Sequence, residues 1–325
     1  MKVVFLHQPS EISAGTRGAS LGKQAMEVVA WKQEDDFFER HQIVGLPHQN
    51  HLLAQEWAEG EEEKGAFKWA KRVKGLIRVF EDTIPTLRDT FQNEEVFPLI
   101  LGSAHGATAA SLKALKAAYP EDRIGVIWVD AHGDLHSPYT SPSGNMHGMP
   151  LAMALQSDNY DHRRRDLHAE TVRHWDELKA LGAETPVMQP EDIILIAARD
   201  LEVQERELMT DAGIRNLPVR RVREEGAHTI AAEALDMLKD CDRIFVSFDV
   251  DSLDASISRG TGTPVPDGLL VSEAKRLLMD LAKSPAVTAI DFVEINPTLD
   301  NKGNKMAEVA FDILKNVVEI LENHR

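Results

Sequence analysis

Short, continuous apolar runs recur along the chain, separated by longer polar or helix-like stretches. The runs are rich in Val, Ile and Phe and do not alternate with polar residues, which indicates strands buried on both faces, as in a parallel sheet. The predicted strands are Val3–Leu6, Phe97–Leu101, Ile124–Val129, Ile193–Ala197, Ile244–Phe248 and Val287–Phe292.

The stretches between these runs carry apolar residues at helical spacing. Strands that alternate with helices predict an α/β fold built from βαβ units. The sequence shows no internal repeat and no low-complexity linker, so residues 1–325 are expected to form a single domain. An acidic run, Glu61–Glu63, is expected on a solvated loop or at a helix start. The predicted helices are Phe67–Phe91, Ala107–Ala118, Glu170–Leu181, Ala231–Lys239, Ser272–Lys283 and Lys305–Asn323.

Charge and composition exclude several classes of protein. A net charge of −17 argues against a nucleic-acid partner, because binding phosphates requires clustered Lys and Arg. The apolar run at the N-terminus is too short for a signal peptide or a membrane span. Cys241 is the only cysteine, so the chain has no intramolecular disulfide and no thiolate metal cluster. A reducing cytoplasm is the expected location.

Three of the predicted strands run directly into polar clusters. In an open α/β sheet, ligands bind outside the carboxyl ends of the strands, so these clusters are expected to converge on one crevice. Residues two apart project to the same side while the chain stays extended. Taken singly, an Asp in such a place also fits a helix cap or a turn. The clustered side chains are His105, then Asp130, His132 and Asp134, then Asp249 and Asp251.

Four carboxylates and two neutral imidazoles have the composition of a site for two divalent ions. Oxygen-rich ligation with some imidazole favours manganese(II), with cobalt(II), nickel(II) or iron(II) as substitutes. A structural zinc site would normally use thiolates, which this chain lacks. A two-metal site activates water near neutral pH, which predicts hydrolysis without a covalent enzyme intermediate.

Two further residues are candidates for catalysis. His147 would move protons, and Glu294, which follows the strand beginning at Val287, would position a cationic substrate. The alternatives are a loop histidine without catalytic duty and a glutamate that only serves a turn.

Taken together, these motifs are similar to those of the ureohydrolase superfamily, which comprises arginase, agmatinase and formimidoylglutamase. The resemblance extends from the Gly-Thr-Arg-Gly-Ala-Ser-Leu-Gly segment at 15–22 to Glu-Ile-Asn-Pro at 294–297. Its most specific parts are Asp-Ala-His-Gly-Asp-Leu at 130–135 and Ser-Phe-Asp-Val-Asp-Ser-Leu-Asp at 247–254. It implies a three-layer α/β/α fold with a central, mainly parallel sheet, a binuclear manganese centre, and hydrolysis of a guanidinium group to urea.

Within the superfamily the sequence resembles arginase most closely, which implies L-arginine as substrate and L-ornithine as second product. Ser143 and Asn145 match the arginase segment that binds the amino-acid carboxylate. The resemblance assigns the remaining positions as follows: His136 near that carboxylate, Glu202 facing the ammonium, Thr263 and Glu294 in the guanidinium pocket, and His147 as the proton shuttle.

The resemblance also implies metal assignments and an assembly. Asp130 and Asp249 would bridge the two metals, while Asp134 would also accept a proton during the reaction. His105 and Asp134 would complete one metal's sphere, and His132 and Asp251 the other's. Family members form trimers or hexamers, so a homo-oligomer is expected.

The chain departs from the family pattern at three positions. Ala104 stands where the family motif has an Asp, so it cannot make that residue's hydrogen bonds to the surroundings of His105. His136 replaces an Asn, and Glu202 is one methylene longer than the usual Asp. These departures leave alternatives open: a ureohydrolase acting on agmatine, a guanidino acid or formimidoylglutamate, or a non-catalytic ligand-binding homologue with a weakened metal site.

Overall fold

A computed structural model describes residues 1–53 and 65–324. In this part of the chain, eight strands form one sheet in which every pair of neighbours is parallel, in the order β2-β1-β3-β8-β7-β4-β5-β6. The expectation for Glu61–Glu63 lies outside the described residues. The strands are β1 (Lys2–Gln8), β2 (Gln42–Gly45), β3 (Val96–Gly102), β4 (Ile124–Val129), β5 (Ile193–Ile196), β6 (Arg215–Leu217), β7 (Arg243–Asp249) and β8 (Val287–Val293).

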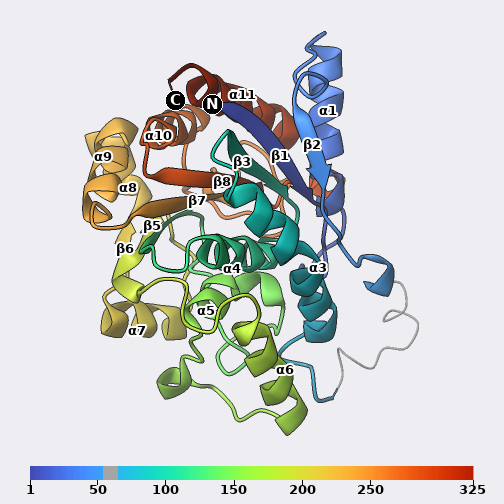
Figure 1. Cartoon of the computed structure of the whole chain (residues 1–325), viewed down its shortest axis with the longest axis vertical. Helices are drawn as coiled ribbons and strands as arrows, with labels where there is room; N and C mark the ends of the chain where they lie inside the picture. Colours follow the sequence, from blue (N-terminus) through green and yellow to red (C-terminus); the bar gives the residue numbers. More distant parts are fainter. Residues whose placement is uncertain (54–64, 325) are drawn as a thin grey trace.

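Helices cover both faces of the sheet and give the molecule three layers (Figure 1). One core cluster joins one face of the sheet to α1 (Gly22–Lys32), α9 (Ala227–Met237), α10 (Val271–Ala282) and α11 (Lys305–His324). The other cluster joins the opposite face to α3 (Val73–Phe91), α4 (Thr108–Ala118), α5 (Pro150–Leu155) and α6 (Ala169–Ala180). The chain also contains α7 (Val203–Ala212) and α8 (Val219–Glu225) beside the β6 edge. The predicted α/β/α architecture is confirmed.

All six strands expected from apolar runs are present, each within two residues of its expected bounds. The sequence pattern missed the two edge strands, β2 and β6. An edge strand is covered on fewer sides, and Arg215–Leu217 accordingly contains Arg and Asn instead of a continuous apolar run. The pattern also missed α1, α5, α7 and α8.

Helix α3 begins six residues later than expected, at Val73. The preceding residue, Arg72, has a left-handed backbone conformation (φ 59°) that ends any helical continuation towards Phe67. Its buried guanidinium donates to the backbone carbonyls of Ile12 and Ala14. The start of the helix is therefore set by a tertiary contact, which periodicity along the chain cannot reveal.

The strand order places β3, β8, β7 and β4 next to one another in the middle of the sheet. Because all strands are parallel, their carboxyl ends lie on the same edge, where open α/β sheets bind ligands. Three of these strands are the ones that run into the polar clusters of the sequence, and the fourth runs into Glu294. The fold therefore brings these distant segments together at one edge.

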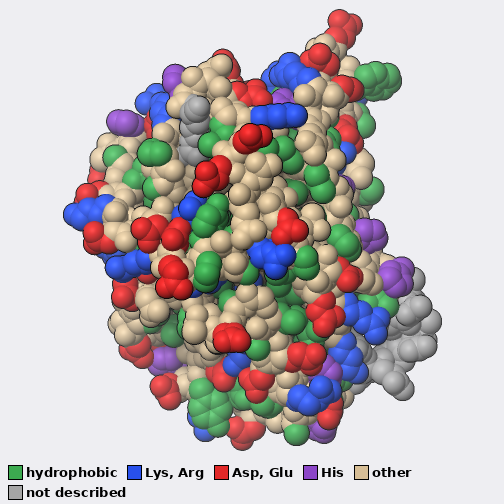
Figure 2. Space-filling model, viewed as in Figure 1, with side chains coloured by type: hydrophobic (Ala, Val, Ile, Leu, Met, Phe, Trp, Pro, Cys, Tyr) green, Lys and Arg blue, Asp and Glu red, His purple; other side chains and the backbone are tan. Residues whose placement is uncertain are grey.

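The surface mixes charges of both signs. On the face shown in Figure 2, acidic and basic side chains lie interspersed among polar and apolar ones. Within the described residues, no helix combines the length and the apolar character needed to cross a membrane.

The packing of α10 against the sheet gives a stability prediction. Leu277 is fully buried, so Leu277→Ala should lower the free energy of unfolding by about 2–5 kcal/mol through lost burial and a residual cavity. Leu21 is 47 % exposed, and Leu21→Ala should change it by less than about 0.5 kcal/mol. Urea unfolding of the three proteins measures both effects; equal losses in the two variants would contradict this account of the core.

Candidate metal centre

Two local turns of the same design present the acidic residues. Asp130 follows β4 and its Oδ1 accepts a hydrogen bond from the backbone N–H of His132 (2.7 Å). Asp249 ends β7 and its Oδ1 accepts from the N–H of Asp251 (2.8 Å). In each turn the Asp side chain fixes the backbone two residues on, so that both residues of the pair face the same space. These aspartates therefore serve a turn, as the alternative interpretation held, and face the cluster as well.

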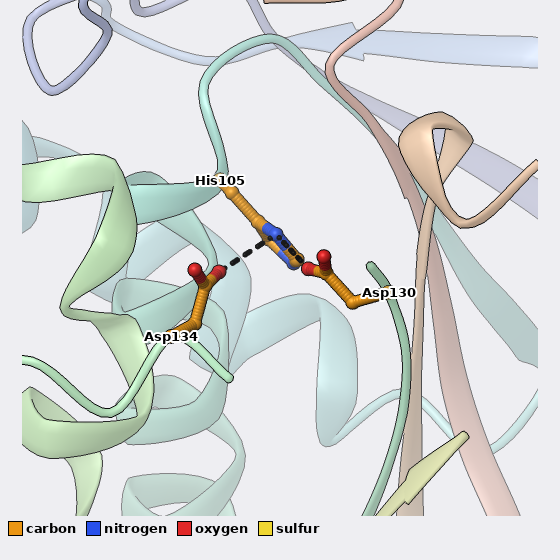
Figure 3. Close-up of side chains that lie close together, drawn as sticks. All are labelled: His105, Asp130 and Asp134. Atoms are coloured by element: carbon orange, nitrogen blue, oxygen red, sulfur yellow. Dashed lines mark ion pairs between the residues drawn. The ribbon is translucent and has the colours of Figure 1, made fainter. Parts of the chain in front are cut away.

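His105 stands at the centre of the first group of side chains. Its Nδ1 lies 3.1 Å from Asp130 Oδ2, 3.0 Å from Asp134 Oδ2 and 3.1 Å from an oxygen of Asp249. Figure 3 shows Asp130 and Asp134 approaching the His105 ring from two sides. All of these side chains are almost completely buried.

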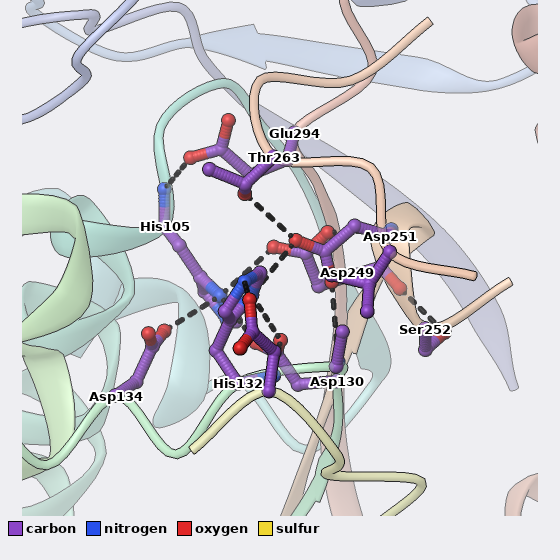
Figure 4. A network of polar contacts seen from close by, with 12 residues as sticks. His105, Asp130, His132, Asp134, Asp249, Asp251, Ser252, Thr263 and Glu294 are labelled. Atoms are coloured by element: carbon purple, nitrogen blue, oxygen red, sulfur yellow. Dashed lines mark hydrogen bonds and ion pairs between the residues drawn. The ribbon is translucent and has the colours of Figure 1, made fainter. Parts of the chain in front are cut away.

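His132 is the centre of the second group. Its Nδ1 lies 3.3 Å from Asp130 Oδ1 and 3.0 Å from Asp251 Oδ2. Asp130 therefore directs one carboxylate oxygen to each histidine, so the two groups share it. Figure 4 shows all six side chains in one network. Two sets of side chains could each hold an ion. One consists of His105, Asp130 and Asp134; the other consists of Asp130, His132 and Asp251.

The hydrogen bonds from His105 Nε2 through Ser247 to Asp291 indicate that Nδ1 carries a lone pair and no proton in the neutral ring. The Ser247 hydroxyl donates to Asp291 Oδ1 (2.6 Å), so its oxygen is left to accept from His105 Nε2–H (2.7 Å). Nδ1 of the neutral ring then carries a lone pair that faces three carboxylate oxygens. Within the described residues, His105 Nδ1, Asp130 Oδ2 and Asp134 Oδ2 are buried without a hydrogen-bond partner. A cation among these atoms would satisfy all of them, so the donor set fits a metal ion.

The electrostatics of the cluster agree with this geometry. Burial, and then repulsion from Asp251 and Asp130, raises the pKa of Asp249 well above its usual range. Burial and the charge of Asp130 raise the pKa of Asp134 to about 6. Although burial opposes it, the surrounding carboxylates raise the pKa of His105 and of His132, so without a metal ion these two imidazoles bind protons that offset part of the buried negative charge. A divalent cation would replace those protons.

Support for His105 comes from neighbouring strands and not from residue 104. Its ring stacks on Trp128 of β4, with centroids 4.2 Å apart and planes 5° from parallel. Asp291 of β8 also accepts from Thr108 (2.6 Å), which fixes its carboxylate behind Ser247. The missing Asp at position 104 therefore does not leave His105 unsupported.

This support predicts a measurable effect on metal binding. Asp291→Asn keeps the size of the side chain but weakens the acceptor that orients Ser247 and, through it, His105. The affinity for metal should fall on the order of 10- to 100-fold, as is usual when the partner of a ligating histidine is lost. Titration of metal-free protein with manganese measures it, and an unchanged affinity would contradict the role given to Asp291.

A pocket of about 170 Å³ opens above this cluster. Five of the six clustered side chains line it, and Asp130 lies beneath them. Its other lining residues that the sequence had singled out are His136, Ser143, Asn145, His147, Glu202 and Thr263.

Glu294 lies beside the cluster in an unusual backbone conformation (φ 64°). Its Oε1 accepts from the backbone N–H of His105 (2.9 Å) and lies 3.8 Å from His147 Nδ1. Thr263 donates its hydroxyl proton to Asp251 Oδ2 (3.0 Å), as Figure 4 shows. Burial lowers the pKa of His147 to about 4, so its imidazole is neutral at physiological pH.

The residues expected to bind the amino-acid end of the substrate differ in their solvent exposure. Ser143 and Glu202 are exposed, and Asn145 is half-buried. His136 is buried: its Nδ1 contacts Thr140 Oγ1 (3.1 Å), and its Nε2 lies 3.5 Å from Glu205 Oε2.

Sequence reasoning missed several residues of this site. Glu205 lines the pocket and is buried, and a signal was present in its spacing of three from Glu202, which forms a helix capping box. Asp291 is a charged residue inside an apolar strand, which also could have been noticed. Ser141 and Asp200, which line the pocket as well, carried no comparable signal.

The parallel sheet covered by helices on both faces, with two His/Asp groups that share a carboxylate at its carboxyl edge, fits a metal-dependent hydrolase of the two-metal class. Comparison with known proteins makes this specific. The family model described as "Arginase family" matches residues 2–319. The arginase of Bacillus caldovelox is 36% identical over 311 residues, which are 94% of each chain, and that of Brevibacillus brevis is 32% identical over 321 residues, 95% of each. The solved structure of the Bacillus caldovelox arginase superimposes with a TM-score of 0.77 and 28% identity over 98% of each chain.

The chain belongs to the arginase family. It is an arginase-like hydrolase that acts on guanidino C–N bonds. Enzymes of this family carry a binuclear metal centre, and the His/Asp cluster of this chain has the donor set for one.

Proposed function

We propose that this chain hydrolyses L-arginine to urea and L-ornithine with two manganese(II) ions as cofactor. The observation that carries the proposal is Asp130, whose two oxygens face two separate histidine-centred groups at the floor of one pocket. The arginase relatives, which match nearly the whole chain, support arginine as the substrate.

Six side chains would hold the two ions. Asp130 and Asp249 would bridge them; His105 and Asp134 would bind only the first, and His132 and Asp251 only the second. Oxygen-rich ligation with one imidazole per ion suits manganese(II), with cobalt(II), nickel(II) or iron(II) as substitutes. When bound, two such ions supply Lewis acidity and bring the pKa of water towards neutrality.

The guanidinium end of the substrate would be held by Glu294 and Thr263. A carboxylate that accepts two parallel N–H bonds fixes both the position and the plane of a guanidinium. Glu294 would thereby hold the electrophilic carbon over the cluster, with its position relative to His105 set by their backbone contact.

Two side chains are placed to move protons. Asp134 would accept the proton lost from the attacking water as the tetrahedral intermediate forms. His147, whose Nδ1 is 3.8 Å from Glu294, would deliver a proton to the departing amine, which leaves as the neutral amino group of ornithine. Because burial lowers the pKa of His147 to about 4, its ring is neutral and would act as a relay: one ring nitrogen would accept a proton from solvent as the other donates its own proton to the departing amine.

The amino-acid end of arginine would contact the rim of the pocket. The Ser143 hydroxyl and the Asn145 amide would donate to the carboxylate, with His136 close to the same group, and Glu202 would face the ammonium. This donor loop favours arginine over agmatine, which has no carboxylate to receive these hydrogen bonds.

The proposal includes the organisation of the protein. Residues 1–325 would form one ureohydrolase domain, supported by a sheet whose strands run from β1 to β8 and by core clusters that each combine distant segments. We further propose a cytoplasmic homo-oligomer, a trimer or a hexamer, in line with the family resemblance.

A substrate panel after manganese loading tests the proposal. L-Arginine, agmatine, 4-guanidinobutyrate and formimidoylglutamate would be compared at alkaline pH, with urea, ornithine and metal content measured on the same sample. Urea and ornithine from L-arginine are expected, with two ions per chain. Absence of both products would overturn the arginase assignment, and turnover of another substrate alone would identify the relevant ureohydrolase. Fewer than one tightly bound ion per chain would favour a non-catalytic homologue.

A further inference from the structure

Arg199 follows β5, and the long loop between β7 and α10 folds around its side chain. Its side chain is more than half buried and makes hydrogen bonds only with backbone carbonyl oxygens among those the structure describes. Nε donates to Pro266 (2.8 Å), Nη1 to Ala197 (3.1 Å) and Ser252 (3.3 Å), and Nη2 to Asp251 (3.0 Å), Leu253 (3.3 Å) and Val265 (2.9 Å). One guanidinium therefore fixes both ends of the loop that carries Asp251 and Thr263.

The backbone of the same residue holds the other turn of the site. The N–H groups of Arg199 and Asp200 both donate to the carbonyl of Ala131, at 2.8 and 2.9 Å. Ala131 lies between Asp130 and His132, and its own N–H donates to Asp251 Oδ1 (3.2 Å). Arg199 thus connects the turn that presents His132 with the loop that presents Asp251.

The surroundings of Arg199 require a planar group with many donors. An arginine has five N–H donors in a rigid fork, whereas a lysine has three donors on one flexible ammonium. The loop also packs closely around this fork: a Cβ added at Gly268 would lie 2.5 Å from the carbonyl carbon of Leu253 and 2.6 Å from Arg199 Nη2. A lysine would keep the positive charge but could not hold carbonyls on both sides of the loop.

The two halves of the centre are supported differently. His105 is held by Ser247, Asp291 and Trp128, none of which contacts the guanidinium in the bonds described above. His132 and Asp251 are carried by the two segments that Arg199 joins. We propose that Arg199 is the positioning residue for the His132–Asp251 half of the metal centre, so that its loss weakens metal binding in that half alone. This inference rests on the two-metal centre proposed above.

Metal titration of variants separates this role from a general structural one. R199K and R199M would be loaded at stepped manganese concentrations, with bound metal counted by mass spectrometry and paired ions detected by electron paramagnetic resonance. The second ion should bind on the order of 10- to 100-fold more weakly, with loss of the spin-coupled signal, while the first binds as in the unmodified protein.

R123K is the matched control, because Arg123 also makes several hydrogen bonds, to Asp192, but lies at the opposite end of β4. It should retain two ions with unchanged affinity. Two tightly bound ions in R199M would overturn the inference. So would parallel loss of both ions together with a lower Tm of the metal-free variant, which would reveal only a structural role. If the unmodified protein itself binds no metal, the two-metal proposal fails instead.

Discussion

Urea formation by the manganese-loaded protein should fall about a thousandfold or more when Asp130 is replaced by asparagine, a loss of about 4 kcal/mol of transition-state stabilisation. Asp130 is the only described side chain that belongs to both groups able to hold an ion. An asparagine offers one oxygen and one NH₂ group, so it can serve one histidine-centred group but presents a donor to the other. Metal content should fall below two ions per chain.

Asp312→Asn is the control for Asp130→Asn, because it removes the same formal charge from an exposed position on α11. It should leave metal content and the rate of urea formation unchanged. Initial rates and metal content measured on one preparation decide the matter. An Asp130→Asn protein that keeps two ions and most of its activity would show that the shared carboxylate is not needed.

Replacing Glu294 by glutamine should lower kcat/KM for L-arginine about a hundredfold, corresponding to about 3 kcal/mol. The proposed reason is the loss of the charged, bidentate contact with the guanidinium. Glutamine can still accept the hydrogen bond from the His105 N–H with its remaining oxygen. Its NH₂ group, however, would face the N–H groups of the substrate, and its net charge is zero.

The metal content of the Glu294→Gln protein separates substrate binding from metal binding. Two ions per chain should remain, because Glu294 contacts His105 through the backbone and not through the imidazole. Steady-state kinetics with metal analysis measures both quantities. Unimpaired kcat/KM, or a loss fully explained by missing metal, would contradict the assigned contact with substrate.

The sequence was sufficient to predict the centre of the fold because its strands are buried on both faces. Ile124–Val129 and the other continuous apolar runs could not be partly exposed without cost, so their pattern directly reflected their position. The polar residues that end these runs were equally visible, because a carboxylate such as Asp130 is unusual directly after a buried strand. Because neighbouring strands are parallel, the polar residues at their carboxyl ends lie at the same edge of the sheet.

The remaining features depend on contacts that no local pattern encodes. The short edge strand β6 is defined by pairing with β5, although its residues are mostly polar. In the sequence, Arg199 looked like any charged loop residue. The backbone carbonyls that its guanidinium contacts in the β7–α10 loop lie some fifty to seventy positions further along the chain. The support of His105 by Asp291 likewise joins two strands far apart in sequence, so the change at Ala104 looked more damaging than the structure shows it to be.

Strand β8 has a consequence for how the protein is made. It alone joins β2-β1-β3 to β7-β4-β5-β6, and it is the last strand of the sheet to be synthesised. Until Val287–Val293 has left the ribosome and inserted, the segment with His105 and the segments with Asp130 and Asp249 belong to two unconnected half-sheets. The set with His105 therefore comes together only after the sheet has closed, whereas Asp130, His132 and Asp251 follow the directly paired strands β4 and β7. We expect the ion at His105 to bind last.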